Sequence, residues 1–149
     1  MYVMDNETLV MSQSSDSTEY GITLTDVSKR LQHLGYTVTD DDLSQLQFEL
    51  DKIINYVLNY CNITTIPTIL NPRIIDRVCC EFLFYKKNSG QLEGFNYDAV
   101  IKEVKEGDTT LKYATGADGD TVESRFDKFI NKLERGFDKW LTPHRRLRW

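Results

Sequence analysis

The sequence has few of the residues from which catalytic and metal sites are usually built. It holds only two histidines and three cysteines in 149 residues. His33 and His144 lie far apart, and Cys61, Cys79 and Cys80 show neither a CxxC nor a paired Cys/His spacing. No HExxH, GxSxG, GxxxxGK[ST] or GxGxxG motif is present. The sequence therefore predicts a protein that is not an enzyme and that needs neither a cofactor nor a metal.

Long apolar runs are also missing. No run approaches the ~20 apolar residues that cross a bilayer, so we expect no contact with a membrane. The first 20 residues carry four acids and no base, and they lack the apolar stretch of a secretory signal. The cysteines fall in runs with helical spacing, which is typical of reduced, buried thiols. These absences together predict a protein that stays in the cytoplasm where it is made.

What the sequence does have is an uneven distribution of charge. The net charge is −5, yet the part from Arg125 onward carries eight bases and three acids, which gives +5. The first 124 residues must therefore carry −10. Such a split is typical of a tail or surface that has a partner of its own.

Four segments repeat their apolar residues at the spacing of a helix. They are residues 23–34, 40–61, 71–87 and 120–140. Asn71-Pro72 provides a favoured helix start, and Asp120-x-x-Glu123 has the pattern of a capping box. Gly136 is a position where the last helix could bend or break. We expect the apolar stripes of these helices to bury one another.

The spacing of apolar and polar residues changes between the third and fourth segments. Residues 98–114 alternate in side-chain character around a Glu106-Gly107-Asp108 turn signal, which predicts a β-hairpin. A hairpin of two strands is marginal in water, so helices or a neighbouring subunit must cover it. The predicted fold is mainly α: a small bundle of about four helices with one β-hairpin and extended N- and C-terminal arms.

The predicted organisation has three parts. Residues 1–21 form a flexible arm, residues 22–142 form the helical domain with the hairpin near 98–114, and residues 143–149 form a basic and aromatic tail. The arm either orders on assembly or stays a mobile end. Arginine and tryptophan are enriched in binding hot spots, so Trp149 either docks into a partner or folds back on its own domain.

Several short strings, in order along the chain from about residue 24, resemble the head–tail connector proteins of phages and prophages of Firmicutes. They are Tyr60-Cys61-Asn62-Ile63 with Ile66-Pro67, Glu81-Phe82-Leu83, the turn region from Val104 to Thr110, and the ending Arg145-Arg146-Leu147-Arg148-Trp149. The family often has lysine where Arg146 stands. The long N-terminal arm is unusual for it.

This resemblance implies a virion structural protein, made in the cytoplasm of a bacterial host and placed in the virion neck, the head–tail junction. It would form a homo-oligomeric ring, twelve copies in the family's design, below the portal protein. The ring would extend the channel for duplex DNA, without sequence-specific binding, and join the capsid to a stopper, neck or tail protein. The tail would bind the portal, and the hairpin would contact neighbouring subunits. The tail residues are Arg145, Arg146, Leu147, Arg148 and Trp149, and the hairpin residues are Val104, Gly107, Asp108, Thr109 and Leu111.

Two other functions remain open. One is a different neck protein, such as a stopper or tail-completion protein. The other is a small helical DNA-binding regulator, since the basic C-terminal part could contact phosphates. Against the regulator, the net charge is acidic and no helix-turn-helix with a basic recognition helix is evident. The acidic residues of the first 124 positions suit a DNA channel, because their repulsion of the phosphates lets a duplex slide through without binding.

Overall fold

The structure is a computed structural model, and it describes residues 20–92, 95 and 121–147. Within these residues the chain forms four α-helices. They are α2 (Leu24–His33), α3 (Leu43–Cys61), α4 (Asn71–Asn88) and α7 (Val122–Leu141). Short 3-10 turns precede α3 and α4 and follow α7, at Asp40–Asp42, Thr68–Leu70 and Thr142–His144. The predicted small helical bundle is confirmed.

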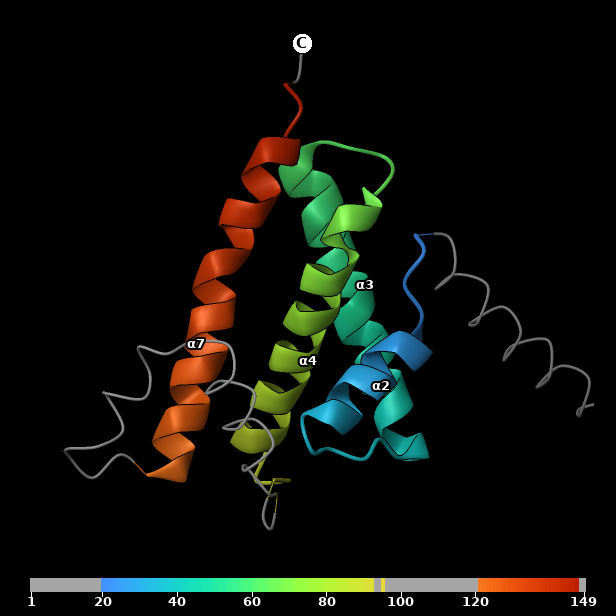
Figure 1. Ribbon diagram of the computed structural model, residues 1–149. Coiled ribbons are helices and arrows are strands. Elements are labelled where there is room, and N and C mark those ends of the chain that lie inside the picture. Colours follow the sequence, from blue (N-terminus) through green and yellow to red (C-terminus); the bar gives the residue numbers. More distant parts are fainter. Residues whose placement is uncertain (1–19, 93–94, 96–120, 148–149) are drawn as a thin grey trace, which may run out of the picture.

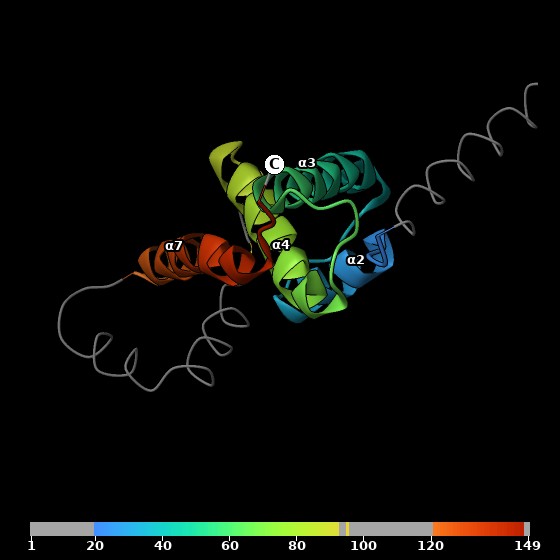
Figure 2. The ribbon, with the colours of Figure 1, turned by 90° about the horizontal axis from the view of Figure 1, so that it is seen from above.

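Helix α4 lies at the centre of the bundle. Figures 1 and 2 show α2 and α7 on opposite sides of α4, with α3 packed along it. The tail leaves beyond the C-terminal end of α7, where that helix meets the end of α3 (Figure 1). In the part of the chain that is described, no helix is both long and apolar enough to cross a membrane.

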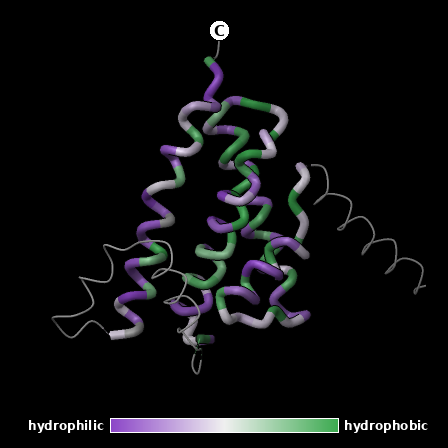
Figure 3. The backbone as a smooth tube through the Cα atoms, viewed as in Figure 1, coloured by the Kyte–Doolittle hydropathy of each residue, from purple (hydrophilic) through white to green (hydrophobic). Residues whose placement is uncertain are grey.

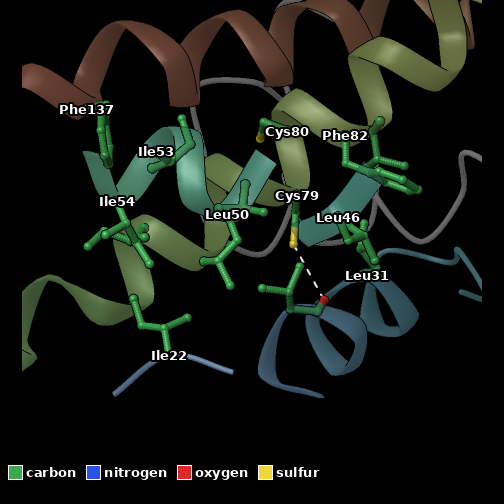
Figure 4. Packing of buried hydrophobic residues seen from close by; sticks show 14 of the residues in the cluster. Ile22, Leu31, Leu46, Leu50, Ile53, Ile54, Cys79, Cys80, Phe82 and Phe137 are labelled. Carbon is green, nitrogen blue, oxygen red and sulfur yellow. Dashed lines mark hydrogen bonds between the residues drawn. The ribbon is translucent and has the colours of Figure 1, made fainter. Parts of the chain in front are cut away.

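The hydrophobic core runs through all four helices. Figure 4 shows the side chains of α3 and α4 interdigitating with residues from α2 and α7. Three consecutive residues of α4, Val78, Cys79 and Cys80, are all buried. Cys79 faces α2, where its thiol lies 3.7 Å from the carbonyl oxygen of Val27, while Cys80 borders α7. The thiols act as small apolar side chains, as predicted, and all three cysteines are free and buried.

Local chemistry sets the ends of the helices. Thr23 and Asp26 form a capping box at the start of α2. Gly35 has φ of 89°, and the following Tyr36 N–H donates to the Leu31 carbonyl over 2.9 Å, which closes the helix in a Schellman motif. Thr121, rather than the predicted Asp120, caps α7, because its hydroxyl accepts a hydrogen bond from the Ser124 N–H.

A buried carboxylate joins the start of α3 to the end of α4. Asp42 is 2% exposed, and its side chain pairs with the Lys86 ammonium at 2.6 Å. The other carboxylate oxygen accepts hydrogen bonds from the Tyr36 hydroxyl at 2.8 Å and the Thr39 N–H at 3.0 Å. Burial by itself would raise the pKa of Asp42, but the hydrogen bonds from Lys86, Thr39 and Tyr36 outweigh it and lower that pKa.

The structure bears on two further expectations from the sequence, the hairpin and a possible break in the last helix. The hairpin near 98–114 is not supported, because the described residues contain no strand and the segment lies outside them. Helix α7 continues through Gly136 to Leu141 and does not break there. A single glycine costs ~1 kcal/mol in a helix interior, which packing of the apolar face of α7 offsets.

Asp42→Asn should lower the free energy of unfolding at pH 7 by about 2–4 kcal/mol, because it leaves the Lys86 ammonium without its carboxylate partner in a largely buried site. Urea denaturation measures this. The difference in free energy of unfolding between the wild type and the variant should be fully present above the ordinary aspartate pKa of about 4. It should vanish as the pH falls through the lowered pKa that Asp42 has in the folded protein. Asp41→Asn, a neighbouring exposed carboxylate, is the matched control and should change little. Equal losses in both variants would contradict the role given to Asp42.

Candidate functional site

The structure places part of the predicted tail at one end of the bundle. Arg145 is in extended conformation after the turn Thr142–His144, and Arg145, Arg146 and Leu147 are all exposed. Leu147 is 76% exposed, which is the largest exposure of any bulky apolar side chain in the described residues. Arg148 and Trp149 lie outside the described residues, as do the hairpin residues Val104, Gly107, Asp108, Thr109 and Leu111.

The base of this tail is held against the C-terminal end of α3. The Arg146 N–H donates to the Cys61 carbonyl over 2.8 Å. The Asn62 side-chain amide lies 3.5 Å from the Arg146 carbonyl. The last carbonyls of a helix have no partner within it, so the extended tail supplies one of the missing donors. We call this set of contacts the tail anchor: the backbone of Arg146 with Cys61 and Asn62.

The tail can reach these groups because α3 ends abruptly. Asn62 adopts the left-handed conformation with φ of 53°, which terminates the helix and turns the chain away. The Ile63 N–H then donates to the Leu58 carbonyl over 3.1 Å. The Cys61 carbonyl is thereby free to accept the hydrogen bond from the Arg146 N–H. Asparagine is among the few non-glycine residues that tolerate this conformation.

Aromatic and cationic side chains surround the tail anchor. The rings of Tyr56 and Tyr60 stack with their centroids 5.7 Å apart. The Arg145 guanidinium lies 4.9 Å from the centroid of the Tyr60 ring, and that of Arg73 lies 4.0 Å from Trp140. Cation–π contacts at exposed positions contribute about 0.5–1 kcal/mol each. Of these contacts, the one with Tyr60 restricts the Arg145 side chain where the chain leaves the bundle.

Hydrogen bonds between α3 and α7 hold the two helix ends together beneath the tail. The Tyr56 hydroxyl donates to Asp138 over 2.7 Å, and the Tyr60 and Thr142 hydroxyls lie 3.4 Å apart. Burial, together with the neighbouring Asp138 carboxylate, raises the pKa of Tyr56 to about 12. The phenol keeps its proton at neutral pH and can donate it to the Asp138 carboxylate. The Cys61 thiol, 3.5 Å from the Leu141 carbonyl, has a pKa raised by burial.

A polar cleft of about 300 Å³ opens between α3, α4 and α7. Arg77 bridges Glu81 at 2.8 Å and Glu134 at 3.4 Å within it. Lys52 lies 3.7 Å from Glu81, so the cleft walls are joined by ion pairs. No cysteine lines this cleft, and in the described residues no three His, Cys, Asp or Glu side chains gather as they would around a metal ion. Of these ion pairs, only the one between Arg77 and Glu134 joins α7 to the bundle, and we assign no chemistry to the cleft.

Sequence reasoning found the tail but missed its anchor. Tyr56 and Tyr60 are four residues apart, which places both rings on one face near the end of α3. Arg73 and Trp140 come from different helices, so no local pattern links them. The spacing of the two tyrosines was the one feature of the sequence that could have indicated a contact surface at this end of α3.

Arg146→Pro should release the tail, because proline lacks the N–H that donates to Cys61. Arg146→Ala is the matched control, since it removes the same side chain and keeps the N–H. We expect the ¹H–¹⁵N heteronuclear NOE of the Leu147 amide to fall in the proline variant and to stay near the wild-type value in the alanine variant. Equal NOE values in the two variants would show that the backbone bond does not hold the tail.

Comparison with known proteins gives no neighbour for this chain. No protein-family model, no curated protein and no solved structure matches it. Its function must therefore be argued from its own residues and from the geometry of the anchored tail.

Proposed function

We propose that the protein is a virion structural protein, a head–tail connector that binds a portal with its C-terminal tail. The observation that carries this proposal is the anchored tail: Arg146 is hydrogen-bonded to the end of α3 while Leu147 points into solvent. The ordered strings that resemble phage connectors support the same function. The described residues form a helical bundle, which agrees with the helical protomer that the resemblance implies.

The tail combines two features of a docking segment. Its arginines can form bidentate hydrogen bonds with carboxylates on a partner, and Leu147 can enter an apolar pocket. The tail anchor holds the first residues of the segment before the partner arrives. Binding therefore has to order fewer residues than it would for a free peptide, which lowers its entropic cost.

A connector of this kind works as a ring below the portal. A ring needs two different surfaces on each copy, one for each neighbour. The flanks formed by α2 and by α7 lie on opposite sides of α4 and are suited to this requirement (Figure 2). Twelve copies, a place in the virion neck, a stopper or tail protein as the next partner, and the hairpin as a subunit contact all remain part of the proposal.

A DNA-binding regulator is the second candidate, because four exposed bases lie on one face of α7. They are Lys128, Lys132, Arg135 and Lys139. A regulator should shift duplex DNA, with an affinity that falls steeply as salt rises. A connector should bind portal rings and show little affinity for the duplex. A different neck protein, such as a stopper, should bind the connector ring rather than the bare portal.

Removing residues 145–149 should abolish co-sedimentation with purified portal rings, because it removes the exposed docking residues. The thermal unfolding midpoint should change by only a few degrees, since the removed part that the structure describes is exposed and donates only two backbone hydrogen bonds, to Thr142 and Cys61. Lys29→Glu, an exposed base on α2, is the control and should leave co-sedimentation unchanged. Electron microscopy should show a second ring stacked on the portal. If the truncated protein still sediments with the portal, the proposed role of the tail in portal binding is wrong.

A further inference from the structure

The charges of α7 are sorted between its two sides. Its apolar side packs on the bundle through Phe126, Ile130 and Phe137. Lys128, Lys132, Arg135 and Lys139 repeat at i, i+4, i+7 and i+11, which places them together on the side away from that apolar face. Figure 3 shows hydrophilic and hydrophobic residues alternating along this helix. We call these four residues the basic face.

Three acids of α7 contact other helices of the bundle, while the fourth, Glu123, is exposed in the first turn. Asp127 pairs with Lys87 of α4 at 2.5 Å, and Glu134 lies 3.4 Å from Arg77 of the same helix. Asp138 accepts the hydrogen bond from Tyr56 of α3. These three acids thus have partners in α3 and α4, whereas the four bases of the basic face are all exposed. The face is about 16 Å long and borders a shallow depression of about 500 Å³ that also includes Asn131 and Gly136.

A matching charge is present elsewhere in the same chain. Residues 1–19 carry four acids and no base. Their attachment point is on the far side of the bundle from α7: Ile22 is fully buried, and the Gly21 carbonyl lies 3.5 Å from the Asn71 side-chain amide. Figures 1 and 2 both place this start of the described chain beside α2, with α4 between it and α7. A segment of 19 residues spans about 60 Å when extended, enough to reach a neighbouring molecule.

We propose that the basic face of α7 binds the acidic N-terminal segment, residues 1–19, of a neighbouring copy of this chain. The inference rests on the proposed function, because it describes how neighbouring copies in the ring hold one another. The donor side lies at α2 and the acceptor side at α7. Each copy therefore gives its segment to one neighbour and receives a segment from the other, as a closed ring requires. The attraction between exposed charges is screened by salt.

Exchange of the charges tests this directly in the full chain. One variant replaces the four bases of the basic face with glutamate, and a second replaces Asp5, Glu7, Asp16 and Glu19 with lysine. A third carries both sets of changes and so has the wild-type net charge of −5. Sedimentation velocity at low salt, over a range of protein concentrations, measures self-association. We expect each of the first two variants to associate with an affinity at least about tenfold lower than that of the wild type. We expect the third variant, which carries both sets of changes, to recover the wild-type affinity.

Several outcomes would overturn the inference. They are a wild type that stays monomeric at every concentration, single-set variants that associate like the wild type, and a combined variant that fails to recover. So would a duplex-DNA shift that disappears in the first variant while its sedimentation is unchanged, because the face would then serve nucleic acid. All changes fall on exposed positions or on residues 1–19, and thermal unfolding checks that each variant folds.

Portal co-sedimentation separates this inference from the proposed function. Protein that binds portal rings, but assembles regardless of the charge exchange, would refute only the inference about residues 1–19. Protein that recovers its association when both charge sets are exchanged, yet ignores the portal, would refute only the connector function.

Discussion

The structure depends on the burial of α4 on several sides at once. Residues i, i+1 and i+2 of a helix point in directions about 100° apart, so one partner cannot cover Val78, Cys79 and Cys80 together. Each fully buried apolar side chain contributes about 1.5–3 kcal/mol, so leaving one of these faces open to water would be costly. Helices α2 and α3 cover part of this surface and α7 covers another. The position of every other helix follows from this need.

Polar contacts then join the helices that cover α4 to that helix at defined points. The Asp42–Lys86 pair fixes the start of α3 against the end of α4. The pairs from α4 to Glu134 and Asp127 join α7 to α4, and the burial of the apolar face of α7 leaves its basic face outward. Orientation of α7 in turn brings the end of that helix beside the end of α3. The tail anchor exists only because these two helix ends meet.

The tail anchor links the fold to the proposed function. A basic peptide attached by a free hinge would sample many directions, and a partner would have to order all of it. Here the Arg146 hydrogen bond and the stacking of Arg145 on Tyr60 restrict the base of the tail, while Leu147 stays accessible. The opposite placement of α2 and α7 gives the molecule two distinct flanks. A portal-facing end and two neighbour-facing flanks are the surfaces that a ring-forming connector needs.

The sequence by itself determined the four helices and most of their buried residues, because helical periodicity and capping are local properties. It also located the basic tail, since charge can be counted along the chain. Only the tertiary structure decided that Arg146 is bonded to Cys61, that Arg73 lies over Trp140, and that Asp127 of α7 pairs with Lys87 of α4. These contacts join residues far apart in the chain, and their partners are chosen by how α4 is covered, which no short pattern encodes.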